Sequence, residues 1–184
     1  TRAEAIGIEV VTGDPAVIAK ADALILPGVG SGPAAMAALE KRALVQPIRD
    51  YANSGRPFLG ICLGLQLFLD RTEEGNGSCL GIVAGEVKRL PAGLKVPHMG
   101  WNSVHFETAH PVFQGISQDS YFYFVHSYYV NAADDAQVFG TTQYGSVSAH
   151  VAIGRDATFA VQFHPEKSSR AGLRLLENFV TWTP

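Results

Sequence analysis

Short apolar runs alternate with segments of helical periodicity through the first 70 residues of the chain. Strands are expected at residues 8–11, 23–26 and 57–61, where apolar side chains cluster. Helices are expected at residues 14–20, 34–40 and 47–51, and another begins after residue 61, because Leu65, Phe68 and Leu69 recur at helical spacing. Alternating strands and helices predict a parallel α/β sheet, which binds ligands beyond the carboxyl ends of its strands.

The pattern changes after residue 77. Strands without helices between them are expected at residues 83–90, 101–106, 121–130, 138–142, 147–153 and 158–163. A last helix at residues 171–182 is expected to turn Leu173, Leu176 and Phe179 towards the sheet. The expected fold class is therefore α/β, with a mostly parallel central sheet, helices on both faces and an antiparallel extension. No repeat or linker divides the chain, so one domain is expected over residues 1–184.

Cys62 stands at the junction between a predicted strand and the helix that follows it. Gly60 and Gly64 flank it in the frame of a nucleophile elbow, with cysteine in the place of serine. A sharp strand-to-helix turn strains the middle residue and leaves no room for flanking side chains. The thiol would face the positive end of the helix dipole, which favours the thiolate, and backbone N–H groups there could hold an oxyanion. Taken alone, the motif is equally compatible with a buried structural cysteine between packing glycines.

A glycine-rich loop and a histidine are expected at the same end of the sheet as Cys62. The loop at residues 27–33 contains three glycines and could approach a ligand closely, although a plain strand-to-helix turn would look the same. His164 ends a buried strand, and Glu166 follows after one proline. A cysteine nucleophile needs a base, and the base needs an orienting group. His164 alone would be an ordinary strand-end histidine, but with Cys62 and Glu166 it forms a candidate triad.

Composition and charge narrow the classes of function. The 184 residues are 47% hydrophobic with a net charge of −3, which argues against a surface for nucleic acid or anionic membrane. No apolar run approaches the length of a membrane span and no basic leader opens the chain, so a cytoplasmic protein is expected. Two cysteines are too few for a disulfide framework, and Cys79 is expected to be a small core residue. The six histidines show no metal-ligand spacing, so neither a metal nor a cofactor is expected.

Five spaced motifs resemble those of a known family. They are Leu-Pro-Gly-Val-Gly-Ser at 26–31, Gly-Ile-Cys-Leu-Gly-Leu-Gln at 60–66, Pro-His-Met-Gly-Trp-Asn at 97–102, Phe-Val-His-Ser-Tyr-Tyr at 124–129 and Gln-Phe-His-Pro-Glu at 162–166. In this order they resemble the class I, or triad, glutamine amidotransferases, and among these the glutaminase subunits of imidazole glycerol phosphate synthase. The resemblance covers essentially the whole chain. It implies a flavodoxin-like amidotransferase fold and the hydrolysis of L-glutamine to glutamate and ammonia, for histidine biosynthesis.

The resemblance also implies residue roles. Cys62 would attack the side-chain amide of glutamine, His164 would move the proton and Glu166 would orient His164. Water would then hydrolyse the glutamyl thioester. The implied oxyanion donors are the backbone N–H of Leu63 and, after a peptide rearrangement, the segment around Val29 and Gly30. The positions that match the holders of the substrate are Gly30, Gln66, Ser127 and Tyr128.

A partner subunit is implied as well. In the family the ammonia passes to a (β/α)₈-barrel cyclase, which makes imidazole glycerol phosphate and an aminoimidazole ribotide, so a heterodimer is expected. Trp101, Tyr123 and Lys167 match positions near that interface. The residues themselves agree in part, because the aromatic run at 121–124 offers more apolar surface than one sheet face can hide. The alternative is that its rings lie on two buried faces.

The amino end departs from the family pattern. Members usually begin with another strand and a Gly-Asn-containing turn, whereas residues 1–6 resemble the tail of a helix that stops at Gly7. The first strand is therefore expected to be missing from the sequence, with consequences for folding and regulation but not for the catalytic motifs. Two other functions remain open: a cysteine peptidase on the same architecture, and the glutaminase of pyridoxal phosphate synthesis. A binding subunit with a dead site is disfavoured by the complete triad.

Overall fold

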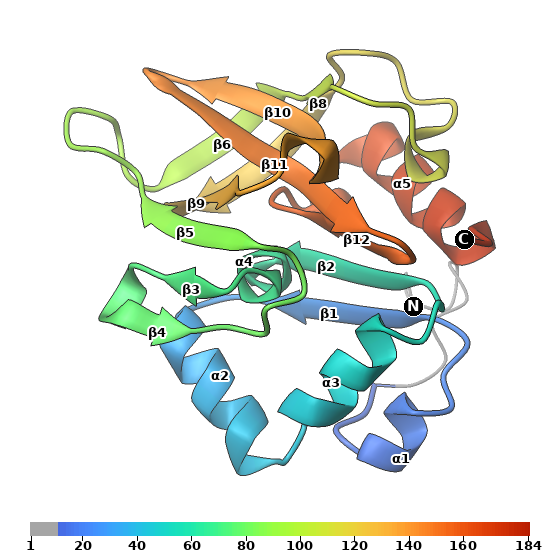
Figure 1. Ribbon diagram of the computed structural model, residues 1–184. Helices are drawn as coiled ribbons and strands as arrows, with labels where there is room; N and C mark the ends of the chain where they lie inside the picture. Colours follow the sequence, from blue (N-terminus) through green and yellow to red (C-terminus); the bar gives the residue numbers. More distant parts are fainter. Residues whose placement is uncertain (1–10) are drawn as a thin grey trace.

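The computed structural model describes residues 11–184 (Figure 1). The expected helix tail at 1–6 and, apart from Val11, the expected strand at 8–11 lie outside the described residues. The helices are α1 (Pro15–Ile18), α2 (Gly32–Lys41), α3 (Val45–Ala52), α4 (Leu63–Phe68) and α5 (Ser169–Thr181). Short 3₁₀ turns are η2 (Glu74–Asn76), η3 (Pro111–Phe113), η4 (Asp135–Gln137) and η5 (Pro165–Lys167). The strands are β1 (Leu24–Gly28), β2 (Phe58–Cys62), β3 (Arg71–Thr72), β4 (Gly77–Ser78), β5 (Gly85–Arg89), β6 (His98–Ser103), β7 (His105–Phe106), β8 (Tyr121–His126), β9 (Tyr128–Ala132), β10 (Val138–Tyr144), β11 (Val147–Arg155) and β12 (Thr158–Val161).

Three parallel strands place the candidate site. Strand β2 lies between β1 and β12, and both pairs are parallel. Gly28 is opposite Cys62 in the first pair, and Ile61 is opposite Val161 in the second. The carboxyl ends of all three strands therefore meet at one edge of the sheet, as the alternation of strands and helices predicts.

An antiparallel extension follows on the β12 side of these three strands. The sheet runs in the order β1-β2-β12-β11-β9-β5-β3-β4, and from β12 to β5 every neighbouring pair is antiparallel. The β3–β5 pair is parallel, while β10 pairs with β11 and β7. Strands β6 and β8 form a separate two-stranded sheet. The α/β class and the antiparallel extension are confirmed, but the sheet is mixed and its parallel part is smaller than predicted.

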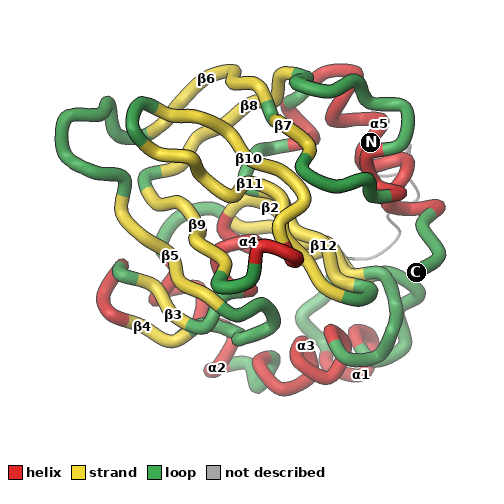
Figure 2. Tube along the Cα trace, turned by 45° about the horizontal axis from the view of Figure 1, so that its top comes forward, coloured by secondary structure: helices red, strands yellow, loops and turns green. Residues whose placement is uncertain are grey.

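Two apolar cores lie on opposite faces of the sheet, and Figure 2 shows α1–α3 on one side and β6, β8 and α5 on the other. Alternation along the central strands divides their side chains between the cores. Phe58 and Ala160 belong to the core beneath α2–α4, whereas Leu59 and Phe159 belong to the core beneath α5. Helices thus cover both faces, as expected.

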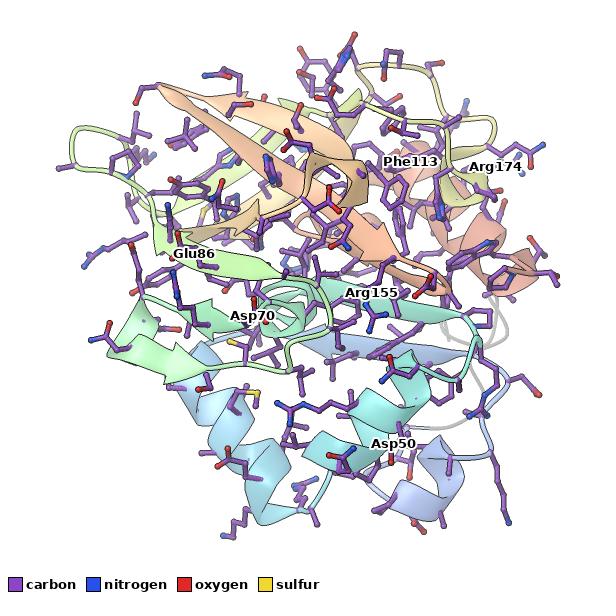
Figure 3. All side chains as sticks on the ribbon, viewed as in Figure 1. Asp50, Asp70, Glu86, Phe113, Arg155 and Arg174 are labelled. Carbon is purple, nitrogen blue, oxygen red and sulfur yellow. The ribbon has the colours of Figure 1, made fainter. Side chains whose placement is uncertain are left out.

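Arg155 ties the extension to the helical layer. It ends β11, lies between the strands and α3 in Figure 3, and donates a 2.9 Å hydrogen bond to Asn53 Oδ1 just beyond that helix. Its Nε donates to the carbonyl oxygen of Ile82. One guanidinium therefore joins three segments that are distant in sequence.

Two runs predicted as single strands are each divided between two sheets. The run at 121–130 breaks at Ser127 into β8, which pairs with β6, and β9, which pairs with β5 and β11. The run at 101–106 breaks at Val104 between β6 and β7. The prediction of unbroken strands was wrong because apolar and aromatic residues continue on both sides of Ser127, although Phe124 packs in one core and Val130 in the other.

Two burial predictions were also wrong. Strand β1 is half-buried, with Pro27 exposed, rather than buried on both faces. Leu173 is 40% exposed, because α5 turns a different face inward. That face carries Gly172, Leu175, Leu176 and Phe179, and a Cβ on Gly172 would lie 1.9 Å from the carbonyl oxygen of Pro165. This backbone contact sets the rotation of the helix; Leu176 and Phe179 are buried as predicted.

Within residues 11–184, no helix combines the length and apolarity that crossing a bilayer would require. The same residues contain no group of three or more histidine, cysteine or acidic side chains that could hold a metal ion.

Candidate functional site

Cys62 occupies a strained turn between β2 and α4. Its backbone has φ 55° and ψ −104°, a combination that a residue with a side chain rarely adopts, and it is the N-cap of α4. A Cβ on Gly60 would lie 2.9 Å from Cβ of Ala160, and one on Gly64 would lie 1.9 Å from the carbonyl oxygen of Leu26. The flanking glycines are therefore required by close backbone packing, which is the reason that the sequence motif suggested.

Gln162 contacts the thiol, and Gln66 contacts Gln162. The Nε2 atom of Gln162, a fully buried residue, lies 3.7 Å from Sγ of Cys62. The Oε1 atom of Gln162 accepts a 3.1 Å hydrogen bond from Nε2 of Gln66. The same Nε2 donates to the carbonyl oxygen of Tyr128 at 3.3 Å. Both amide hydrogens of Gln66 are thus used, and no described residue donates to its Oε1.

His164 is buried and held on three sides. Its Nδ1 lies 2.7 Å from Oε1 of Glu166, its backbone N–H donates to the carbonyl oxygen of Tyr123 at 2.9 Å, and its own carbonyl accepts from Ser168 Oγ at 2.6 Å. Burial raises the pKa of Glu166, but its hydrogen bond with His164 and nearby positive charge outweigh burial and leave that pKa below the usual value. The carboxylate therefore accepts from Nδ1–H, and Nε2 is left for the thiol.

The thiol and the imidazole lie close together. The pKa of His164 is raised to about 9, chiefly by its interaction with Cys62 and next by its hydrogen bond with Glu166, while burial acts in the opposite direction. Nε2 has no aligned hydrogen-bond partner among the described residues, so the thiol is near but not in ideal geometry. A pKa near 9 makes His164 an imidazolium at neutral pH, ready to donate a proton.

Removal of either neighbour is expected to lower the pKa of His164. An NMR titration of its ring protons should give a value near 9 in the intact chain, the lowest value in Cys62→Ala and an intermediate value in Glu166→Gln. Because the folded pKa exceeds the ordinary 6.5, protonation of His164 stabilises the fold fully below that pH, and this contribution is lost as the pH rises through about 9. If the pKa of His164 were the same in both variants as in the intact chain, His164 would not interact with Cys62 or Glu166 as described.

The glycine loop lies beside the start of α4. A Cβ on Gly28 would lie 3.0 Å from Cβ of Leu63, and Gly30 has φ +95° with nothing within 4 Å of an added Cβ. Val29 is 79% exposed. The loop is therefore next to Leu63, is rich in glycine and is open at Gly30, which is the property that a rearrangement of its peptides requires.

Ser127 and Tyr128 link the site to the antiparallel extension. Ser127 is the half-buried residue between β8 and β9, and Tyr128 begins β9. The carbonyl of Tyr128 accepts from Gln66, which in turn donates to Gln162, the residue that contacts Sγ of Cys62.

The expected interface residues lie on one exposed face. Trp101 is 52% exposed, and its ring lies 6.1 Å from that of Tyr123 in an edge contact. Lys167 is exposed in η5, next to Ser168, whose hydroxyl accepts from the Tyr123 backbone N–H at 2.9 Å. In β8 the phenylalanines are buried and Tyr121 is 62% exposed, so the run at 121–124 does leave aromatic surface open.

Two site residues were missed in the sequence. Gln162 lies beside Sγ and fixes the Gln66 amide; the signal was a polar residue following the fully apolar end of a buried strand. Glu74 accepts a 2.7 Å hydrogen bond from the Gly32 backbone N–H and so anchors the end of the glycine loop. Only the fold brings Glu74 to that loop, because the two positions are 42 residues apart.

Proteins of similar sequence identify the family of the chain. The sequence model of the class-I glutamine amidotransferase family matches residues 5–182. The imidazole glycerol phosphate synthase subunit HisH of Moorella thermoacetica is 54% identical over 170 residues, which cover 92% of this chain and 80% of that protein. The subunit of the same name from Methylococcus capsulatus is 50% identical over 184 residues, covering 95% and 84%.

Solved structures share the fold at low sequence identity. A crystal structure of a glutamine amidotransferase matches with a TM-score of 0.73 and 17% identity over 98% of this chain and 90% of that one. The structure of PurLQS from Thermotoga maritima matches with a TM-score of 0.65 and 19% identity, over 87% and 79%. At these identities the likeness concerns the fold alone.

Proposed function

Because the chain belongs to the class-I glutamine amidotransferase family, we propose that it hydrolyses L-glutamine through Cys62, His164 and Glu166, as the glutaminase subunit of an imidazole glycerol phosphate synthase in histidine biosynthesis. The observation that carries the proposal is the strained Cys62 beside a buried histidine whose other ring nitrogen is held by a carboxylate. That arrangement is the minimum that an activated cysteine nucleophile requires.

The reaction proceeds in two halves. In the first, the Cys62 thiolate attacks the side-chain carbonyl carbon of glutamine, and the His164 imidazolium gives its proton to the leaving nitrogen, which departs as ammonia. In the second, His164 takes a proton from water, whose oxygen attacks the thioester and releases glutamate. Glu166 keeps the proton of Nδ1 in place, so that Nε2 performs both transfers.

The oxyanion of each tetrahedral intermediate is held by backbone donors. The Leu63 N–H, at the first residue of α4, has no partner within its own helix. The second donor comes from the Val29–Gly30 peptide after a rearrangement, which the open space around Gly30 permits.

The substrate is held by Gly30, Gln66, Ser127 and Tyr128. Since both hydrogens of the Gln66 amide are engaged, the group it offers to glutamine is the acceptor Oε1. An acceptor binds N–H groups and repels a carboxylate, so where Oε1 faces the side-chain amide of glutamine this residue contributes to the selection of the amide over the acid.

The ammonia passes to a partner, a (β/α)₈-barrel cyclase that forms a heterodimer with the chain. Two features support this proposal. The relatives at 50–54% identity bear the name of a synthase subunit, and the exposed face of Met99, Trp101 and Tyr121 offers an apolar surface for docking, with Lys167 near Tyr123.

A glutaminase assay tests the proposal. The chain should release glutamate from glutamine, and a barrel cyclase that carries its ribonucleotide ligand should increase the rate roughly tenfold or more. Stimulation by the barrel subunit of pyridoxal phosphate synthase instead would favour the nearer alternative. Cleavage of casein without release of glutamate would point to a cysteine peptidase and overturn the proposal.

A further inference from the structure

Two buried histidines take no part in the chemistry described above. His98 begins β6 and His126 ends β8, and they are register partners in the two-stranded sheet. They are 4% and 6% exposed, and Nδ1 of His98 lies 2.9 Å from Nε2 of His126. Two imidazoles in direct contact inside an apolar layer require a particular placement of their protons.

The neighbours of the pair determine that placement. Nδ1 of His126 lies 2.7 Å from the carbonyl oxygen of Tyr128, which can only accept, so this nitrogen carries the proton. Burial lowers the pKa of both rings to about 4, so each has one proton at neutral pH. Nε2 of His126 must therefore accept, and Nδ1 of His98 must donate to it.

The hydrogen bonds continue from His126 through His98 to Asn102, at the end farther from Cys62. Nε2 of His98, left without a proton, lies 3.4 Å from Nδ2 of Asn102. The Asn102 amide is oriented by donation to the Gln143 carbonyl at 2.9 Å and by acceptance from the Ser103 backbone N–H at 2.9 Å. The His98 ring is stacked between Phe124 and Tyr144, with centroids 4.9 and 4.0 Å away.

The inner end of the chain reaches the candidate site. The Tyr128 carbonyl that accepts from His126 also accepts from Nε2 of Gln66, and Gln66 in turn donates to Gln162 beside Sγ of Cys62. The short hydrogen bond from His126 holds the Tyr128 carbonyl in place, so this carbonyl is a fixed acceptor for Gln66. The orientation of the Gln66 amide thus depends on His126, and the orientation of His126 depends on His98.

We propose that His98 and His126 are positioning residues for the substrate glutamine: both are held as the Nδ1–H tautomer, and together they fix the Tyr128 carbonyl that orients Gln66. This proposal deepens the proposed function and rests on it. It places substrate selection partly on two side chains that lie behind the site and never touch the substrate.

Spectroscopy tests the tautomers without any assay of activity. In the ¹⁵N-labelled chain at neutral pH, both rings should show a protonated, pyrrole-type Nδ1 and an unprotonated, pyridine-type Nε2. Assignment of the signals uses His98→Asn and His126→Asn, each of which removes one set. A protonated Nε2 on either ring would overturn the proposal, whatever the enzyme does with glutamine.

Matched amide substitutions test the positioning. Asparagine places its amide nitrogen where Nδ1 of histidine lies, and glutamine places its amide group near Nε2. His126→Asn should therefore keep the bond to Tyr128 and leave the KM for glutamine within about twofold, whereas His126→Gln should raise it about fivefold or more, the cost of one hydrogen bond. The kcat should change little in both, because Gln66 binds ground state and transition state alike.

A merely structural role gives the opposite order. Asparagine is smaller than glutamine and leaves the larger cavity, so loss of packing alone would make His126→Asn the worse variant. That order would overturn the proposal, as would equal KM values in folded variants. His98→Asn and His98→Gln form a second pair with the same expected order, for the case that a His126 variant does not fold. If the unaltered chain with its barrel partner released no glutamate, the proposed function would fail, while the tautomer measurement would stand by itself.

Discussion

Substitution of Cys62 by alanine is expected to reduce glutamine hydrolysis by at least about 10⁴-fold, the scale on which loss of a nucleophile is felt in comparable triads. The physical reason is that no other described side chain combines a nucleophilic atom with the placement beside His164 and Gln162. Release of glutamate measures the effect. The complex with the barrel cyclase should still form its products from added ammonium salts, because the cyclase chemistry is separate.

Cys79→Ala is the matched control, because it removes the other cysteine. Cys79 is 3% exposed in the core beneath α2–α4, and burial raises the pKa of its thiol to about 11, so it is inert. Its substitution should leave hydrolysis unchanged. If Cys62→Ala also abolished the synthesis that depends on ammonium, Cys62 would matter for folding or assembly and the nucleophile assignment would lose its support.

Gly64→Ala is expected to destabilise the fold by at least about 3 kcal/mol, or to prevent folding. The added methyl group would lie 1.9 Å from the carbonyl oxygen of Leu26, and 3.0 Å from the carbonyl carbon. Neither atom can move away without displacing β1 or α4, since both belong to backbone. Urea unfolding followed by circular dichroism measures the difference in free energy of unfolding.

Gly93→Ala provides the comparison for a glycine with open surroundings. Gly93 has φ +92° and nothing within 4 Å of an added Cβ, so the cost is backbone strain alone, about 1–2 kcal/mol. Equal free energies of unfolding for the two variants would show that the elbow relaxes more easily than its packing indicates. The close fit of α4 against β1 would then not explain the requirement for glycine at position 64.

Prediction from the sequence was most successful where one short stretch by itself determines the local structure. The elbow around Cys62 was predicted from its two glycines, and the same close contacts explain them in the structure. Strands β2 and β12 were equally predictable, because a strand buried on both faces leaves an uninterrupted apolar run.

Prediction failed where the deciding contact is distant in sequence. The break at Ser127 is not visible in the sequence because aromatic and apolar residues lie on both sides of it, whereas the pairing partners and the core differ between β8 and β9. Leu173 was misplaced for a different reason: the contact of Gly172 with Pro165, which is close in sequence, fixes the rotation of α5, and the helical spacing of apolar residues does not reveal it. The His98–His126 pair joins positions 28 residues apart, and the local sequence around either histidine does not indicate that the two are in contact.

The backbone of Tyr123 gives one further consequence. Its carbonyl accepts from the His164 N–H at 2.9 Å, and its own N–H donates to Ser168 Oγ, which in turn donates to the His164 carbonyl. The amide proton of His164 can exchange with heavy water only when β8 separates from the turn that carries this histidine. A protein bound to the outer side of β8 would therefore lengthen the lifetime of that proton, so exchange at His164 would report on contacts made at the exposed face of β8.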